Sequence, residues 1–347
     1  MDSRIARNRR FLTDLFAGPF RGHGIIMDPV TEPSGLLGDV ACSDLPVRRW
    51  LDHALRDYEA DLMLLGALDH DGVPQAKVMT GTEIFAQAFG CPVHVYKDSP
   101  PCALPLVRSP AEADALKVPG LDARPLTRVM ELAQMLRGRL GPDVPIRVPD
   151  IQSPFDIAAL VWRKEDFYLA LMDDPAAVKR LVEKCRALVE AFLKAFRDEL
   201  GEVSFAHCPR AWAPPELGCW LSEDEAGSMT SAMFEEFCVP ALTALSKTFG
   251  GIFIHCCATA DHQYPSFLKI PGLRGMNRVF QESGPRPAIE AFSGRTVLMM
   301  AWIDEATAME MLDLALPETR FLFNMPGQPL EEARGTYERL RERCPRS

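Results

Sequence analysis

The chain lacks the features that mark membrane, secreted and nucleic-acid-binding proteins. None of its apolar runs approaches the roughly 20 residues that a transmembrane helix needs, and no apolar signal-peptide segment follows Met1. The net charge is -10 and the pI is about 5.3, so the chain has no excess of the cations on which nucleic-acid binding depends. We therefore expect a protein that binds neither nucleic acid nor a membrane.

Cysteine is scarce for the length of the chain. Ten cysteines among 347 residues are too few for a disulfide scaffold, and without a secretion signal they indicate a reducing compartment. We therefore predict a cytoplasmic protein. Cys185 and Cys238 lie in amphipathic helical patterns and are expected in the core, whereas Cys344 has no expected role.

Three common motifs of nucleotide binding and catalysis are missing. No Gly-x-Gly-x-x-Gly turn follows a predicted strand, and no Gly-x-x-x-x-Gly-Lys loop is present to hold phosphate groups. The Gly-x-Ser-x-Gly turn of serine hydrolases is absent as well. These absences disfavour a dinucleotide-binding fold and a serine hydrolase.

Repeated short apolar runs are present instead, as in strands buried on both faces of a parallel sheet. The chain is 47% hydrophobic and 25% charged, and its 347 residues fit one α/β barrel. Helical periodicity lies between most runs, so we predict a single (β/α)₈ TIM-barrel domain over residues 1–347. The predicted strands are Gly24–Met27, Asp61–Leu65, Pro145–Val148, Val203–His207, Ile252–Cys257, Leu273–Val279, Val297–Ile303 and Arg320–Asn324.

Three helices are predicted with defined ends. The clearest follows Asp174-Pro175, which supplies a cap and a proline for the first turn. A second runs from Thr230 to Phe249 and ends at Gly250, and the last runs from about Leu330 to Arg343. The first of these helices has an apolar stripe at three-four spacing, formed by Val178, Leu181, Val182, Cys185, Leu188, Val189, Phe192 and Phe196.

One segment does not fit the repeat. Cys91–Tyr96 alternates like a strand, Pro100-Pro101 breaks it, and Ala103–Val107 has the pattern of a returning partner strand. We predict an inserted hairpin after strand two, over about residues 81–108. It either shapes the substrate mouth or is a surface hairpin without functional consequence.

The strand that follows Gly250-Gly251 ends in residues that bind metals. Its apolar run stops at His255-Cys256-Cys257. Because side chains alternate along a strand, His255 and Cys257 share one face and Cys256 takes the other. An imidazole and a thiolate side by side suit zinc, although buried cysteines are often only small core residues.

Other candidate residues stand at the strand ends, where barrels of this kind place their active sites. Asp28, Asp150, His207 and His255 are the candidate catalytic residues, and each could instead be a packed pocket lining. Neighbouring strands lie about 4.8 Å apart, so His207-Cys208 on strand four is expected to reach a metal held on strand five. Trp302 and Asn324 stand at the ends of predicted strands seven and eight and are candidate cofactor-binding residues, and Asp69 and His70 follow predicted strand two.

Two further groups are expected to be structural. Ser222-Glu223-Asp224-Glu225 is predicted to be a solvated run at the start of a helix rather than a catalytic group. Trp212, Trp220 and Trp302 form either an aromatic wall for a substrate or part of the core, and at least one of them is expected in the core.

Five spaced motifs occur in the second half of the chain: Asp150–Ala159, Asp173–Val178, Leu221–Ala226, Met233–Phe237 with Pro240, and Ile254–Cys257. Together they resemble the uroporphyrinogen decarboxylase superfamily. The resemblance covers residues 140–345 better than the N-terminal part. It implies a (β/α)₈ barrel, but it does not select one reaction.

Two branches of that superfamily are compared. The porphyrinogen decarboxylases have an N-terminal loop ending in Arg-Gln-Ala-Gly-Arg-Tyr, whose arginines hold the carboxylates of the tetrapyrrole. The matching region here, Gly24–Ser34, contains no arginine, so a polyanionic porphyrinogen would lack its main cationic partners.

In the corrinoid-linked methyltransferases, zinc is held by His-x-Cys after strand five and by a further Cys after strand eight. His255 and Cys257 match the first two ligands, whereas Asn324 stands near the place of the third. The resemblance therefore leaves the third ligand open. His207, Cys208 and Cys256 are the candidates.

Three functions follow. The first is a zinc-dependent, methyltransferase-like enzyme with the metal at His255, Cys257 and His207, a small-molecule substrate and a corrinoid carried by a partner protein. The second is a metal-free decarboxylase or lyase, in which Asp28, Asp150, His207 and His255 do the electrostatic work. The third is a non-catalytic member that binds a ligand or a corrinoid protein. A homodimer is expected, because dimers are the commonest assembly.

Overall fold

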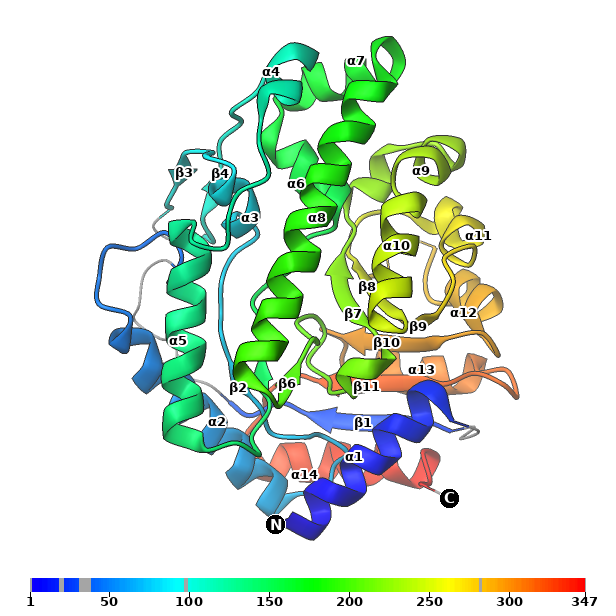
Figure 1. Ribbon diagram of the computed structural model, residues 1–347. Coiled ribbons are helices and arrows are strands. Elements are labelled where there is room, and N and C mark those ends of the chain that lie inside the picture. Colours follow the sequence, from blue (N-terminus) through cyan, green and yellow to red (C-terminus); the bar gives the residue numbers. More distant parts are fainter. Residues whose placement is uncertain (1, 19–21, 31–38, 97–98, 281–282, 347) are drawn as a thin grey trace.

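The computed structural model describes residues 2–18, 22–30, 39–96, 99–280 and 283–346, and its core is formed by two parallel sheets surrounded by helices (Figure 1). All strand pairs in these two sheets are parallel. The predicted α/β fold with parallel strands is confirmed. The six-stranded sheet has the order β1 (Gly24–Met27), β11 (Phe321–Met325), β10 (Val297–Ala301), β9 (Leu273–Arg278), β8 (Ile252–Cys256) and β7 (Cys219–Ser222); the three-stranded sheet has the order β2 (Ala76–Lys77), β5 (Ile146–Arg147) and β6 (Val203–Ser204).

Backbone hydrogen bonds join both edges of the larger sheet to segments beside the smaller one. At the β7 edge, the Ser222 N–H donates to the Ile151 carbonyl over 2.9 Å, and the Ser153 N–H donates to the Ser222 carbonyl over 2.7 Å. At the β1 edge, the Asp71 N–H donates to the Ile25 carbonyl over 2.7 Å. Segments next to β5 and β2 therefore continue the larger sheet at its two sides.

Seven of the predicted strands overlap strands of the structure, and one prediction is wrong. Asp61–Leu65 lies inside α2 (Arg48–Ala67). Its apolar residues belong to a helical stripe, because the buried positions of α2 recur at three-four spacing. The second strand of the sheet system is instead the short β2, and β7 was not predicted.

The helices follow their sequence patterns closely. Asp174 caps α8 (Pro175–Leu200), and all eight residues of the predicted apolar stripe are buried. The last helix, α14 (Leu330–Arg343), has the predicted bounds. The predicted helix from Thr230 to Phe249 is divided at Cys238 into α9 (Ser231–Phe237) and α10 (Val239–Phe249), because Pro240 fits only the first turn of a new helix. The other α-helices among the described residues are α1 (Asp2–Ala17), α3 (Ile84–Ala88), α4 (Pro110–Ala115), α5 (Arg124–Leu140), α6 (Pro154–Val161), α7 (Lys164–Asp173), α11 (Tyr264–Phe267), α12 (Arg286–Phe292) and α13 (Glu305–Leu314).

Two short strands pair within the segment that does not fit the repeat. β3 (Val93–His94) and β4 (Cys102–Ala103) are antiparallel, with Val93 opposite Ala103. Residues 97–98 of the predicted hairpin lie outside the described residues. That the segment is an insertion which shapes a substrate mouth stays a prediction.

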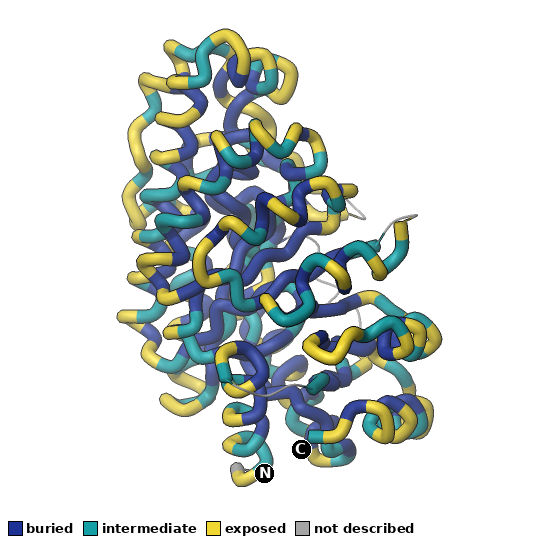
Figure 2. Tube along the Cα trace, turned by 90° about the vertical axis from the view of Figure 1, so that its right-hand side faces the viewer, coloured by how far each residue is buried: buried dark blue, intermediate teal, exposed yellow. Residues whose placement is uncertain are grey.

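Buried residues follow the strands and the inner faces of the helices, and exposed residues lie on the outside (Figure 2). Below the strand ends, Phe253 stacks on Trp220 with ring centroids 4.2 Å apart, and Phe16 of α1 packs edge-on against both rings. Helix α1 therefore fills the lower part of the interior. No described helix is long and apolar enough to cross a membrane.

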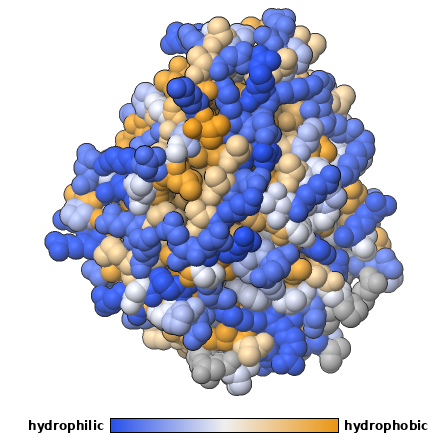
Figure 3. Space-filling model, in the orientation of Figure 1, coloured by the Kyte–Doolittle hydropathy of each residue, from blue (hydrophilic) through white to orange (hydrophobic). Residues whose placement is uncertain are grey.

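The flank of the molecule carries a groove between α5 and α8. Its volume is about 280 Å³, and Figure 3 shows hydrophobic atoms beside a diagonal band of hydrophilic ones on this face. The groove lies between two outer helices rather than at the strand ends. Its lining includes Leu121, Met130, Gln134, Phe192 and Glu199.

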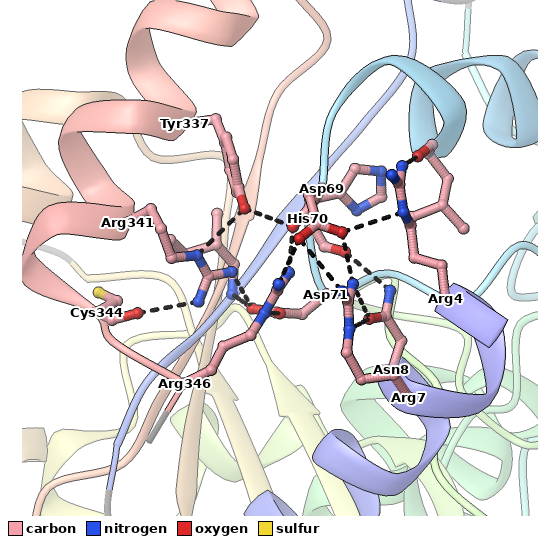
Figure 4. Close-up of polar contacts among 12 residues, drawn as sticks. Arg4, Arg7, Asn8, Asp69, His70, Asp71, Tyr337, Arg341, Cys344 and Arg346 are labelled. Atoms are coloured by element: carbon pink, nitrogen blue, oxygen red, sulfur yellow. Dashed lines mark hydrogen bonds and ion pairs between the residues drawn. The ribbon is translucent and has the colours of Figure 1, made fainter. Parts of the chain in front are cut away.

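The loop before β2 holds the two ends of the chain together, as Figure 4 shows. Asp71 is fully buried and accepts hydrogen bonds from the Ile25 N–H, from Arg341 over 2.6 Å and from Arg346 over 2.7 Å. Asp69 binds Arg7 of α1 and Arg346, each over 2.6 Å. The prediction that Asp69 and His70 follow strand two is wrong. The segment before them is part of helix α2, and the strand β2 comes after them.

Replacing Asp71 with Asn is expected to lower the free energy of unfolding by about 3 kcal/mol or more, because two arginines lose their buried anion. Urea denaturation measures the change. Asp313→Asn is the matched control, since it removes an exposed carboxylate that pairs with Arg343 over 2.7 Å, and it should cost less than about 1 kcal/mol. Equal small losses in the two variants would show that the loop does not anchor the chain ends.

Candidate metal site at the ends of β7 and β8

The candidate site is positioned by the pairing of β7, β8 and β9, which lie side by side in Figure 1. His255 of β8 is in register with Ser222 of β7 and with Asn277 of β9. Partners in register place their side chains on the same face of a sheet. Cys256 takes the opposite face and is fully buried there, as the alternation along the strand predicted.

The conformation of the glycines before β8 fixes where this strand begins. Gly250 has φ of 82° and ends α10, and Gly251 has φ of 158°. A Cβ at Gly251 would lie 2.1 Å from the Leu217 carbonyl oxygen, so no larger residue fits there. This close approach at the start of β8 fixes the register of the strand, and the register in turn fixes the position of His255.

The side chain of Asn277 sets the tautomer of His255. The Asn277 amide nitrogen donates to the Met299 carbonyl over 2.6 Å, so its oxygen faces the ring. That oxygen lies 2.5 Å from Nδ1 of His255, which therefore carries the proton and donates. In the neutral ring, Nε2 is left with a free lone pair, which is the form in which histidine binds a metal.

Three potential ligands meet at the strand ends. A carboxylate oxygen of Asp224, a ring nitrogen of His255 and the sulfur of Cys257 all lie within 4.8 Å of one another. Imidazole, thiolate and carboxylate are the groups that bind zinc in proteins. Three protein ligands that leave a fourth position open are typical of catalytic rather than structural zinc sites.

The loop that carries Asp224 is held by a buried carboxylate. Asp156 of α6 accepts the backbone N–H of Asp224 over 2.7 Å and that of Glu225 over 3.1 Å. Asp224 in turn accepts the backbone N–H of Cys257 over 2.6 Å, which ties the two loops together. Both strand ends are therefore fixed relative to each other before any ligand binds.

The prediction that Ser222–Glu225 is a solvated run is wrong. Ser222 lies in β7, and Glu223 is fully buried. Burial and the neighbouring Asp156 raise the pKa of Glu223 well above its usual range, and burial and Asp224 raise the pKa of Asp156 to about 7. Glu223 faces the interior because it follows a strand rather than starting a helix.

Cys257 is exposed at the end of its strand, next to Asp224. Partial burial of the sulfur and the adjacent carboxylate raise the pKa of the thiol to about 12. A bound cation reverses this effect, because a coordinating thiol is deprotonated by the metal charge. The group therefore has the composition of a metal site rather than that of a metal-free reactive thiol.

His207, predicted as the third ligand, is not a member of this group. The reason is that the sheet neighbours of β8 are β7 and β9, so β6, the strand before His207, is not the neighbour of the strand that carries His255. His207 is buried, and its Nδ1 lies 3.6 Å from Asp150; within the described part of the chain neither ring nitrogen has a hydrogen-bond partner. Cys208 and Cys256 are not members of the group either.

Asp28 and Asn324 belong to a second polar group, centred on Arg210. The Arg210 side chain lies 3.2 Å from Asp28 and also pairs with the buried Asp61. Its backbone N–H donates to the Asn324 side-chain oxygen over 3.1 Å. Asn324, at the position where the resemblance implies a cysteine, therefore binds protein backbone rather than joining Asp224, His255 and Cys257.

Only one of the three tryptophans lies at the site. Trp212 and Trp220 are buried, which confirms that at least one of them is a core residue. Trp302 is 65% exposed, and its ring meets that of His255 edge-on with centroids 5.8 Å apart. Trp302 also has φ of 58°, a conformation that bulky residues rarely adopt and that is often found at functional sites.

Of the residues that the structure groups here, the sequence analysis named His255 and Cys257 as metal ligands but not Asp224, and it assigned no role to Asn277 or Asp156. The sequence does contain a signal for Asp224. Cys219–Ser222 is a short, mostly apolar run followed by acids, a pattern that predicts a strand with polar residues at its end. Asn277 could have been found from strand pairing alone. Asp156 could not, since its role depends on the packing of α6 beneath the loop.

Comparison with known proteins agrees with this architecture. The family model for uroporphyrinogen decarboxylase (URO-D) matches residues 59–213, a segment that starts in the N-terminal part, where we expected less similarity. No curated protein matches the chain. A solved structure, a methyltransferase from Methanosarcina mazei, aligns over 96% of this chain and 98% of its own with a TM-score of 0.67 and 16% identity, which shows a shared fold. The family match supports the resemblance to uroporphyrinogen decarboxylase over residues 59–213, and the structural alignment shows the fold alone.

Proposed function

We propose that the chain is a zinc-dependent, methyltransferase-like enzyme. The observation that carries the proposal is the grouping of Asp224, His255 and Cys257 within 4.8 Å at the ends of neighbouring strands. In this proposal Asp224 takes the place of the third ligand that the resemblance left open. The similarity in fold to a methyltransferase supports the same reaction class.

We also propose that the two sheets close into one TIM-barrel-like β/α barrel, with nine strands among the described residues where eight were predicted. The contacts of Ser222 with the segment after β5, and of Asp71 with β1, support closure at both sides. In such a barrel the candidate ligands lie at the C-terminal ends of the strands, where reactions take place in this architecture.

In this proposal, neighbouring residues hold the candidate ligands in place and fix which nitrogen of His255 carries the proton. Asn277 keeps Nδ1 of His255 protonated, so Nε2 is the nitrogen with a lone pair for a metal. Asp156 and the Cys257 N–H hold Asp224 in place from two sides. Zinc, when bound, would supply the Lewis acidity that converts a thiol to a thiolate or activates the group that carries the methyl.

A small-molecule substrate and a corrinoid on a partner protein complete this proposal. Both Cys257 and Trp302 are exposed next to the buried His255. An exposed indole beside the ligand group offers a flat apolar surface to a substrate or to a cofactor presented from outside. The homodimer and the cytoplasmic location stay predictions.

A metal-free decarboxylase or lyase is the second candidate. The observation that favours it is the pair formed by Asp150 and His207, which lie 3.6 Å apart. Burial raises the pKa of Asp150 and lowers the pKa of His207 well below its usual range, so the pair can exchange a proton without a metal. Retention of full activity after chelation would favour this candidate.

The wild-type chain, expressed with zinc, is expected to retain about one zinc per chain after dialysis, because three protein ligands hold the ion. His255→Ala, Cys257→Ala and Asp224→Asn should each reduce the content to less than about a tenth of that of the wild type. Inductively coupled plasma mass spectrometry measures the metal.

His94→Ala and Cys102→Ala are the controls for this measurement. They remove the same side-chain types from the β3–β4 hairpin and should leave the zinc content unchanged. A wild-type chain without zinc, or three ligand variants that retain it in full, would exclude the proposed site.

Asn277→Leu is expected to lower zinc affinity by about 10- to 100-fold, because His255 loses the acceptor that orients its ring. Asn277→Asp is the matched control, since a carboxylate still accepts the Nδ1 proton and should keep the affinity near that of the wild type. Competition with a chromogenic chelator measures both variants. Equal loss in the two variants would show that the amide supports the strand rather than the histidine.

A further inference from the structure

Two cationic side chains lie side by side on the smaller sheet. Lys77 of β2 and Arg147 of β5 are partners in register, and adjacent strands lie about 4.8 Å apart. Their side chains therefore leave the sheet on the same face. Both residues are half-buried, and among the described residues neither side chain has an ion pair or a hydrogen bond.

The carboxylates near these two cations are engaged elsewhere. Asp28 lies 3.2 Å from Arg210, Asp150 accepts a hydrogen bond from Gln152 over 2.7 Å, and Asp57 lies 3.6 Å from His53. Burial lowers the pKa of Arg147 and of Lys77, and the neighbouring acids offset this only in part. A half-buried guanidinium without a hydrogen-bonded partner is costly in a folded protein.

Arg147 lies at the same end of the strands as the candidate zinc ligands. The charge of Arg147 and that of Asp224 both act on the thiol of Cys208, and Cys257 acts on it as well. Arg147 and the ligand group are therefore both within electrostatic range of Cys208. A substrate held by Arg147 at one end could place its other end beside His255.

We propose that Arg147, assisted by Lys77, binds one anionic group of the substrate, a carboxylate or a phosphate. The guanidinium fork matches two oxygens of such a group, and the ammonium next to it adds a second positive charge. Asp28 nearby limits the net positive charge, so a single anion fits better than the polyanion for which the N-terminal arginines are missing. This inference rests on the proposed function, since it supplies the substrate class for the same site.

Isothermal titration with benzoate, phenyl phosphate and benzamide tests the proposal, because benzamide has the shape of benzoate without its charge. Benzoate or phenyl phosphate should bind saturably and benzamide much more weakly, and the tighter of the two anions identifies the group. Arg147→Met should weaken anion binding by at least about tenfold, because hydrogen bonds to a charged group are lost. Lys77→Met should weaken it less.

Arg180→Met is the matched control, because it removes an exposed arginine that pairs with Asp114, and it should leave anion binding unchanged. Arg147→Lys keeps the charge but not the fork, so it should bind anions more weakly even if Arg147→Met does not fold. Equal affinity for benzoate and benzamide, no saturable binding of either anion, or unchanged anion binding in Arg147→Lys and Lys77→Met would overturn the proposal.

Repeating the titration on chelator-treated protein and on His255→Ala separates this inference from the proposed function. If anion binding depends on Arg147 in a chain that never retains zinc, the anion site is supported and the zinc-dependent methyltransferase proposal is excluded. If the chain binds zinc but no anion, the zinc proposal is supported and the anion site is excluded.

Discussion

The candidate site depends on the contact between His255 and Asn277 across β8 and β9. The two residues are in register, so a slip of one position would turn His255 away from the interior and bring Cys256 inward. The same register places Phe253 opposite Gly275, where a Cβ would lie 2.7 Å from the Phe253 ring. A glycine on one strand thus makes room for the aromatic layer beneath the site, and Asn277 fixes the protonation of the histidine above it.

Around this contact, the acids divide into two buried positioning groups and one partly buried ligand candidate. Asp156 and Glu223 are buried, and both have raised pKa values, so they take up a proton more readily than free carboxylic acids do. Asp224 is only partly buried and accepts the backbone N–H of Cys257. A carboxylate beside a thiol opposes ionisation of the thiol in the free protein, and a divalent cation removes that conflict.

The sequence predicted the large elements well because their patterns are local. The stripe of α8, the cap at Asp174 and the run from Ile252 to Cys257 each require no knowledge of distant contacts. Asp61–Leu65 failed because a short window of a buried helix looks like a strand. The failure to predict the strand Cys219–Ser222 had the larger consequence. Without it, the strand before His207 was expected beside the strand of His255, and Asp224 was expected to be solvated. Lys77 and Arg147 acquire meaning only from pairing between strands 70 residues apart in the printed sequence.

X-ray absorption at the zinc edge tests the central claim most directly, because it counts the atoms around the ion. The account predicts one sulfur at about 2.3 Å together with nitrogen and oxygen neighbours at about 2.0–2.2 Å, and loss of the sulfur shell in Cys257→Ser. Two or more sulfur neighbours, or none, would contradict it, since Cys208, Cys256 or a different site would then hold the metal.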